Sequence, residues 1–173
     1  SAITYAREHK IPYLGLCYGL QLAAIEYARN VVGLEGASST EINPETKYPI
    51  VHDIPFDPKY QRIKGNGVSM RLGGYTCQLK EGTLAHQIYG TTAISERHRH
   101  RYEVNNEYRK QLEDSGLVIS GTSPDNFLVE MIELPKDVHP FFLATQAHPE
   151  YKSRPLSPHP VFTAFLNAAI AGK

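Results

Sequence analysis

The sequence predicts an α/β fold in which a mixed or parallel central sheet is flanked by helices. Two stretches of the chain carry this prediction. Early in the chain, the apolar segment Tyr13–Leu16 has the length of a buried strand and leads directly to a helical pattern at 22–32. Late in the chain, the apolar segment 141–147 is followed by a second helical pattern at 158–171. Strands that alternate with helices along the chain are typical of α/β proteins.

The composition is that of one soluble globular domain. The chain has 173 residues, and its 18 Lys and Arg balance its 18 Asp and Glu, so the overall charge favours neither nucleic acid nor an anionic membrane as a partner. No stretch is apolar for long enough to cross a bilayer, and no signal peptide pattern is present. The two cysteines, Cys17 and Cys77, do not imply a disulfide framework. We therefore expect a cytoplasmic protein with no membrane or nucleic-acid partner.

The turn between the first strand and the first long helix has the pattern Gly15-Leu-Cys17-Tyr-Gly19. Gly-x-nucleophile-x-Gly is typical of a sharp strand-to-helix turn, and we expect both glycines because Cβ atoms at these positions would not fit. Cys17 would then lie at a helix N-terminus, where backbone N–H groups and the helix dipole favour a thiolate. The Tyr18 N–H would point toward a developing oxyanion. Taken alone, the pattern also fits a buried structural cysteine.

A base for this nucleophile is predicted in Thr145-Gln-Ala-His148-Pro-Glu150. An imidazole accepts a proton near neutral pH, and the carboxylate of Glu150 can fix its tautomer. His148 follows the strand 141–147, and open parallel sheets place their sites at the carboxyl ends of strands. A lone histidine after a strand is more often structural, so this prediction depends on the pairing with Cys17.

The other elements follow from local patterns. Helices are predicted at 1–9, 83–89 and 105–114, and strands at 48–54, 67–80, 94–104, 117–120 and 127–134. Alternation within 67–80 places Cys77 on one face with Tyr75 and Leu79, which predicts a small core side chain. Residues 55–67 are predicted to form an exposed connector. The last helix is predicted to turn five side chains toward the core: Val161, Phe162, Phe165, Leu166 and Ala169.

The segment 94–104 alternates two kinds of side chain. As one extended strand it would place His98, His100 and Tyr102 on one side and Arg97, Arg99, Arg101 and Glu103 on the other. A metal site is disfavoured because no set of cysteines or carboxylates lies at ligand spacing around the histidines. A nucleic-acid edge is disfavoured because the basic run is short and the chain is neutral overall.

These motifs together are similar to those of a known family. The resemblance is carried by Cys17 with Gly19 and Gln21, by the segments 25–30, 39–41, 69–73 and 96–105, and by His148-Pro-Glu150. These residues resemble the class I, or triad-type, glutamine amidotransferases, over nearly the whole chain. The resemblance implies a flavodoxin-like α/β fold and the hydrolysis of L-glutamine.

The resemblance also implies roles for individual residues. Cys17 would be the nucleophile, His148 the general base and acid, and Glu150 the residue that orients His148. Tyr18, Gly19 and Gln21 would line the glutamine site, with Glu41 facing the substrate ammonium group and Arg101 its carboxylate, which a guanidinium can bind bidentately. Arg71 would belong to a lid near the site of an activator. No metal site is expected in this chain.

Within the family, the resemblance is to amidotransferase domains that supply ammonia to an amidoligase acting on a phosphorylated uridine nucleotide. Such a parent enzyme uses ATP and Mg²⁺, is activated by GTP and forms a homo-oligomer, a tetramer. Its synthetase domain is not expected here, because the sequence has no Gly-x-x-x-x-Gly-Lys-Ser/Thr pattern. In the family, an earlier segment supplies the first strands and a glycine-rich oxyanion loop. We therefore expect residues 1–173 to be a partial, N-terminally truncated amidotransferase domain, with weak or no activity by itself.

Two rival interpretations remain open. A cysteine hydrolase of the α/β-hydrolase type shares the elbow, that is, the sharp turn Gly15–Gly19 that carries the nucleophile. In that class, however, the acid precedes the histidine, whereas Glu150 follows His148. A non-catalytic or regulatory module that resembles amidotransferases would keep the same motifs. Release of glutamate from glutamine would distinguish these interpretations.

Overall fold

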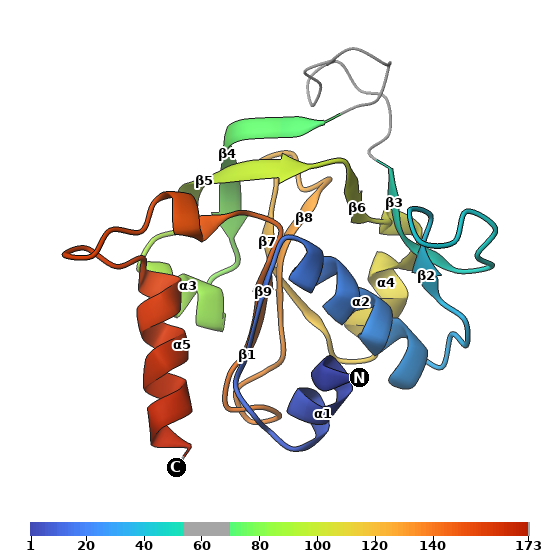
Figure 1. The fold of residues 1–173 in the computed structure, drawn as a ribbon, viewed down its shortest axis with the longest axis horizontal. Helices are drawn as coiled ribbons and strands as arrows, with labels where there is room; N and C mark the ends of the chain where they lie inside the picture. Colours follow the sequence, from blue (N-terminus) through green and yellow to red (C-terminus); the bar gives the residue numbers. More distant parts are fainter. Residues whose placement is uncertain (54–69, 173) are drawn as a thin grey trace.

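The computed structural model describes residues 1–53 and 70–172 and confirms the α/β fold (Figure 1). Within these residues the main sheet has six strands in the order β1-β9-β8-β7-β4-β5. In that order the strands are Tyr13–Leu16, Phe142–Thr145, Val129–Glu133, Val118–Thr122, Arg71–Leu79 and Ala93–His100. β1 and β9 pair in parallel, whereas the other neighbouring strands pair antiparallel. The sheet is therefore mixed, which is one of the two predicted forms.

Helices cover both faces of this sheet (Figure 1). On one side lie α1 (Ala2–Glu8), α2 (Tyr18–Asn30) and α4 (Asn106–Asp114), and on the other lie α3 (Leu84–Tyr89) and α5 (Pro160–Ala171). Side chains at the start of β9 alternate between the two cores: Phe142 packs in the cluster with Leu20, whereas Leu143 and the preceding Phe141 pack in the cluster with Cys77. A strand that is buried on both faces gives the continuous apolar run seen in the sequence.

A small second sheet extends the α2 side of the molecule. β3 (Pro49–Asp53) pairs in parallel with the two-residue β2 (Ser38–Ser39) and antiparallel with β6 (Tyr102–Val104). α4 follows β6 directly, and its first turn is capped by Asn105, whose side chain accepts a hydrogen bond from the Glu107 N–H at 3.0 Å. This cap confirms the predicted start of the helix, because an Asn side chain at that position satisfies a free N–H of the first turn.

The segment 94–104 differs from the single strand that was predicted. It divides into β5 and β6, which belong to different sheets, with Arg101 between them. His98 and His100 are buried on the predicted common face. Glu103 was predicted to lie on the same side as the three arginines, but these are exposed whereas Glu103 is 1% exposed. The break at Arg101 is the reason, because the alternation of β5 does not continue into β6.

Four smaller outcomes concern Cys77, Leu166, the predicted connector and the predicted lack of a membrane-spanning segment. Cys77 is 3% exposed, as predicted for a core side chain, whereas Leu166 of α5 is 59% exposed and does not face the core. The predicted connector at 55–67 lies outside the described residues. Among the helices that the structure describes, none has the length and apolar character needed to cross a membrane.

Candidate active site

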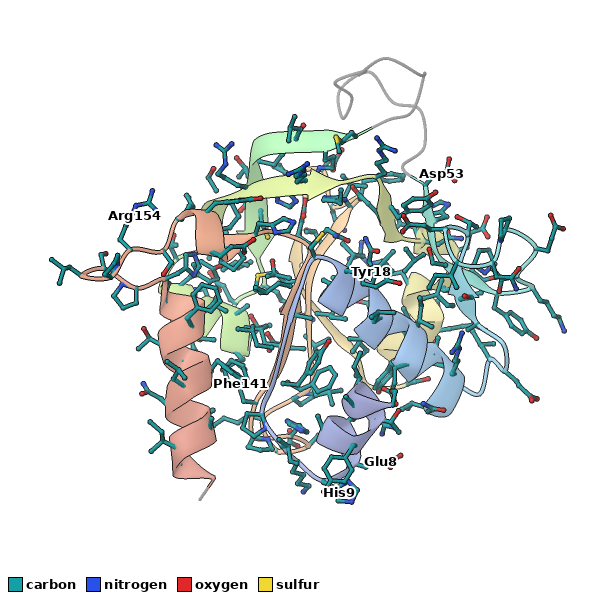
Figure 2. All side chains as sticks on the ribbon, viewed as in Figure 1. Glu8, His9, Tyr18, Asp53, Phe141 and Arg154 are labelled. Carbon is teal, nitrogen blue, oxygen red and sulfur yellow. The ribbon has the colours of Figure 1, made fainter. Side chains whose placement is uncertain are left out.

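Cys17 lies in the sharp turn between β1 and α2, as predicted, with Tyr18 beginning the helix (Figure 2). Its backbone angles are φ 49° and ψ −98°, and positive φ is uncommon for a residue other than glycine. Its N–H donates to the Thr145 carbonyl of β9 at 2.8 Å. This hydrogen bond holds the strained turn against the neighbouring strand. Backbone strain of this kind is concentrated at functional sites.

The two glycines of this elbow are not equivalent. A Cβ atom on Gly15 would lie 2.8 Å from the backbone carbon of Gly19 and 2.9 Å from its carbonyl oxygen, closer than real Cβ contacts. A Cβ atom on Gly19 would meet only the Tyr13 hydroxyl, at an ordinary 3.5 Å. The predicted steric need for glycine is therefore confirmed at Gly15 and wrong at Gly19.

The protonation state of Cys17 also differs from the prediction of a favoured thiolate. Burial raises the pKa of the Cys17 thiol, and the carboxylates of Glu150 and Glu41 act in the same direction. The Tyr18 N–H and the Gln146 side chain lower this pKa, as expected for donors at a helix end, but burial outweighs them. The sulfur therefore needs a base in order to act as a nucleophile.

His148 and Glu150 make the predicted contact, with His148 Nδ1 2.6 Å from Glu150 Oε1. A carboxylate accepts, so Nδ1 carries the proton and Nε2 keeps a free lone pair that can accept one. Leu16 at the end of β1 lies opposite Thr145 at the end of β9. Cys17 and His148 therefore both lie just beyond the carboxyl ends of two adjacent parallel strands.

The backbone of β5 makes hydrogen bonds to the segment that contains His148 and Lys152. The His148 N–H donates to the Arg97 carbonyl at 2.8 Å, and the Lys152 ammonium donates to the Ser95 carbonyl. Between them, the Tyr151 ring lies against the His148 ring, with the centroids 5.4 Å apart. The backbone of β5 thus fixes the position of the imidazole.

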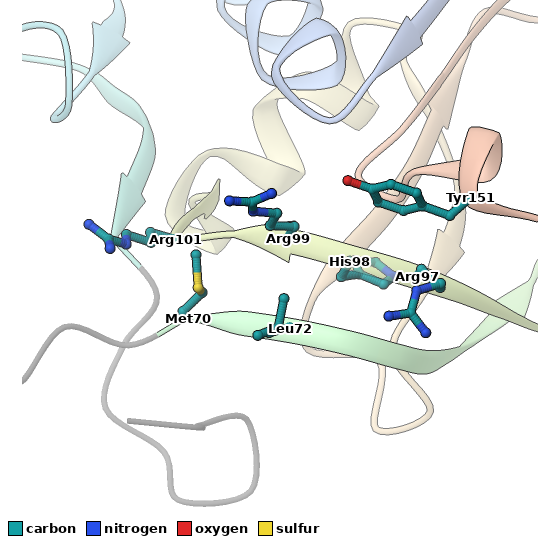
Figure 3. A pocket seen from close by; sticks show the side chains of 7 residues that line it. All are labelled: Met70, Leu72, Arg97, His98, Arg99, Arg101 and Tyr151. Carbon is teal, nitrogen blue, oxygen red and sulfur yellow. The ribbon is translucent and has the colours of Figure 1, made fainter. Parts of the chain in front are cut away.

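A cavity of about 420 Å³ lies over β4 and β5, next to Tyr151 (Figure 3). Its lining is strongly basic: Met70, Leu72, Arg97, His98, Arg99, Arg101 and Tyr151. Arg101, predicted to bind a carboxylate, is exposed and lines this cavity. Glu41, predicted to face an ammonium group, is also exposed and is close enough to Cys17 to raise its pKa. The structure therefore places Glu41 near Cys17 and Arg101 in the basic cavity, and the described contacts include none between these two residues.

Two predicted site residues are buried instead. Gln21 is 3% exposed, and its amide donates to the Tyr102 carbonyl at 2.7 Å, so it does not face solvent beside the nucleophile. Arg71 was predicted to belong to a lid near an activator site but is 1% exposed, paired with Glu130 at 2.7 Å and Glu103 at 3.5 Å. Arg71 is therefore part of the core, where its guanidinium is not accessible to a ligand.

One residue at the nucleophile was missed by the sequence reasoning. Gln146 is fully buried, and its side-chain amide donates to the Cys17 sulfur at 3.6 Å. Its signal in the sequence was its place between Thr145 and His148, because a polar residue inside an otherwise apolar strand end needs a buried partner.

Comparison with known proteins agrees with this geometry. Residues 1–168 match the family model described as glutamine amidotransferase class-I, and the chain belongs to this family. It is 58% identical to a CTP synthase of Nocardioides sp. and 55% identical to one of Staphylococcus aureus, in each case over 170 residues and 98% of the chain. The chain spans 30% and 31% of the length of these two relatives.

Solved structures give the same result. The chain is 38% identical to the glutaminase domain of Trypanosoma brucei CTPS with bound acivicin, with a TM-score of 0.89, covering 98% of this chain and 64% of that one. A putative GMP synthase protein of Thermoplasma acidophilum is 19% identical, with a TM-score of 0.59, covering 98% of this chain and 63% of that one, and shows the common fold.

Proposed function

We propose that this chain is the glutamine-hydrolysing part of a CTP synthase, with Cys17 as its nucleophile. The observation that carries the proposal is the strained Cys17 elbow at the ends of β1 and β9, beside the His148–Glu150 pair at 2.6 Å. A cysteine, an imidazole and an orienting carboxylate are the parts that acyl transfer needs. Membership of the amidotransferase family and the identity to CTP synthases support the choice of glutamine as substrate.

In the first half of the reaction, His148 Nε2 takes the proton of the Cys17 thiol as the sulfur attacks the side-chain amide carbon of glutamine. The raised pKa of Cys17 makes this base necessary. The Tyr18 N–H stabilises the oxyanion of the tetrahedral intermediate. His148 then returns its proton to the amide nitrogen, the carbon–nitrogen bond breaks, and ammonia leaves a γ-glutamyl thioester on Cys17.

In the second half, His148 takes a proton from a water molecule that attacks the thioester carbon. The carbon–sulfur bond breaks, the proton passes to the sulfur, and glutamate is released. Glu150 keeps His148 Nδ1 protonated through both halves, so that Nε2 faces the reaction.

Specificity for glutamine is assigned to one positive and one negative side chain, which would bind the two charged groups of the amino acid. Arg101 would bind the α-carboxylate from the basic cavity, and Glu41 would bind the α-ammonium group. Tyr18 and Gly19, at the start of α2, would contact the side-chain amide through the backbone. Gln21 would act through its hydrogen bond to Gln146.

The rest of the parent enzyme is proposed from the resemblance to CTP synthases, and the two relatives are each about three times the length of this chain. Ammonia would be used by a synthetase domain of the same polypeptide to aminate UTP to CTP with ATP and Mg²⁺, in a cytoplasmic homotetramer. GTP would act as the activator. A direct contact between the activator and Arg71 is left out of the proposal, because Arg71 is buried.

Glutamate release from glutamine tests the proposal in three proteins: the chain itself, Cys17→Ser, and Cys77→Ala as the matched change at the other cysteine. Cys17→Ser should abolish release and Cys77→Ala should preserve it. Residues 1–173 alone are expected to hydrolyse glutamine weakly, so labelling by acivicin, which is bound in the Trypanosoma brucei structure, provides a second readout. Acivicin should modify Cys17, and glutamine should protect it. Glutamate release that survives Cys17→Ser would refute the proposal.

A further inference from the structure

A line of hydrogen bonds runs from the Cys17 sulfur into the core. Gln146 donates its side-chain amide to Cys17 Sγ at 3.6 Å, and its carbonyl oxygen lies 3.3 Å from the side-chain nitrogen of Gln21. Gln21 also donates to the Tyr102 carbonyl at 2.7 Å. Both glutamine side chains are buried, at 0% and 3% exposure. Two buried polar side chains that bond to each other beside a nucleophile are not needed for the packing of the apolar core.

The partners of Gln21 fix which end of Gln146 meets the sulfur. A backbone carbonyl only accepts, so the end of Gln21 that faces Tyr102 must be its NH₂ group. The second hydrogen of that group points at Gln146, which must therefore present its oxygen there. The NH₂ group of Gln146 is then left facing Cys17. Reversing Gln146 would place two donors together at Gln21 and a carbonyl against the sulfur.

The two histidines of β5 hold the far end of this line. His100 Nδ1 lies 3.2 Å from the Tyr102 carbonyl, and His98 Nδ1 lies 3.1 Å from His100 Nε2. Because the carbonyl accepts, His100 donates through Nδ1 and accepts through Nε2. This pattern needs a neutral His100, and both rings are held neutral because burial lowers the pKa of His98 to about 2 and that of His100 to about 3. The histidines therefore position the Tyr102 carbonyl that orients Gln21.

The backbone around Gln146 is equally fixed. Its N–H donates to the Glu130 carbonyl of β8 at 2.8 Å, and the carbonyl of the preceding Thr145 accepts from the Cys17 N–H at 2.8 Å. The side chain of Gln146 and the elbow are thus attached to the same strand end. A donor held in this way loses little conformational freedom when the sulfur becomes charged.

We propose that Gln146 stabilises the thiolate of Cys17 and that Gln21 is the positioning residue that keeps the Gln146 N–H groups on the sulfur. The inference deepens the proposed function, on which its catalytic meaning rests, and it gives Gln21 a role that does not need a direct contact with glutamine. The charged groups that face Cys17 explain the need for such a donor. Glu41 and Glu150 both oppose the thiolate, so the groups that favour it are the N–H groups of Tyr18 and Gln146.

The test is the pH profile of Cys17 alkylation by iodoacetamide, followed by peptide mass spectrometry. A hydrogen bond to a charged group is worth about one pKa unit or more, so Gln146→Leu should shift the profile upward by about one unit. Alkylation at a fixed pH below the pKa should then slow about tenfold. Gln21→Leu should shift the profile in the same direction by less, because Gln146 keeps its N–H groups but not their orientation. Gln111→Leu, at an exposed position of α4, is the matched control and should leave the profile unchanged.

Buried Cys77 reports in the same spectra whether each variant is folded, because it reacts only when the core opens. The unsubstituted chain gives a second test by NMR: the side-chain amide signals of Gln146 should move with the titration of Cys17. An unchanged alkylation profile in folded Gln146→Leu, or Gln146 signals that ignore the titration, would overturn the inference. Alkylation of Cys17 by iodoacetamide does not require glutamine. A shifted profile in a chain that neither hydrolyses glutamine nor reacts with acivicin at Cys17 would thus refute the proposed function alone. Acivicin labelling or glutamine hydrolysis with an unshifted profile would refute this inference alone.

Discussion

Replacing Gly15 by alanine should damage the elbow, whereas the same change at Gly19 should not. The new Cβ at position 15 would lie 2.8 and 2.9 Å from the backbone carbon and carbonyl oxygen of Gly19, and 2.8 Å from the Tyr13 hydroxyl. The hydroxyl can move, but it donates to the Gly19 carbonyl at 2.8 Å, and that backbone begins α2. The turn itself must therefore open.

The expected size of the effect follows from these contacts. Inserting a methyl group into a packed site typically costs about 1–3 kcal/mol, and Gly15→Ala should lower the free energy of unfolding by about this amount. Gly19 lies within α2, its Cβ would meet an ordinary contact at 3.5 Å, and alanine exceeds glycine in helix propensity by about 0.5–1 kcal/mol. Gly19→Ala should therefore be neutral or stabilising.

Urea unfolding followed by far-UV circular dichroism measures both variants, and iodoacetamide measures the reactivity of Cys17 in the folded state. Gly15→Ala should lose stability and slow the reaction of Cys17, because the opened turn moves the sulfur away from Gln146. A Gly19→Ala variant that is destabilised as much as Gly15→Ala, or a fully stable Gly15→Ala, would refute this steric account of the elbow.

Three further changes test other parts of the structure. Glu150→Gln should lower the rate of glutamine hydrolysis by at least about tenfold. The loss should be smaller than the roughly 10⁴-fold loss seen at a buried triad acid, because Glu150 is partly exposed. An unchanged rate would show that Glu150 does not belong to the triad. Arg71→Met should destabilise the fold by about 3–5 kcal/mol in urea unfolding, since it leaves buried carboxylates unpaired, and a neutral change would show that the ion pairs contribute nothing. Burial lowers the pKa values of His98 and His100 to about 2 and about 3, so only the unfolded chain binds their protons below its pKa of 6.5. The contribution of these two rings to the free energy of unfolding therefore falls as the pH drops from 6.5 towards 3, by up to about 1.4 kcal/mol per pH unit for each ring. His98→Asn should reduce that slope in urea titrations at a series of pH values, and an unaltered slope would contradict the neutral assignment.

The elbow and the His148–Glu150 pair could be predicted because each depends on residues close together in the sequence. Tight turns and contacts between residues two apart are set by local geometry. The order of strands and helices likewise followed from periodicity. The antiparallel pairing of β9 with β8 was not specified, because an apolar run indicates a buried strand but not the direction of its neighbours.

The burial of Arg71 could have been predicted from the alternation of its own strand. The alternation that placed Tyr75, Cys77 and Leu79 on one face continues back by twos to position 71, which predicts a buried arginine. Its partners, Glu103 and Glu130, are distant in the sequence and came together only through the sheet. Glu103 itself was misplaced because a periodic pattern does not reveal where the chain leaves one sheet for another.

The charge state of Cys17 and the role of Gln146 depend on distances that no pattern contains. A helix N-terminus favours a thiolate, and that contribution is present at Tyr18, but the depth of burial decides the sign of the pKa shift. Gln146 and Gln21 are 125 residues apart, and their contact arises from the packing of α2 against β9. Long-range polar contacts of this kind require the three-dimensional structure.

The central claim is that Cys17 carries the γ-glutamyl group during glutamine hydrolysis. The most direct measurement is acid quenching of the chain during reaction with glutamine, followed by mass spectrometry of its cysteine peptides. The account predicts that the Cys17 peptide gains the mass of one γ-glutamyl group, that hydroxylamine removes it, and that the Cys77 peptide is unchanged. Glutamate production without any adduct on Cys17, or with an adduct on Cys77, would contradict it.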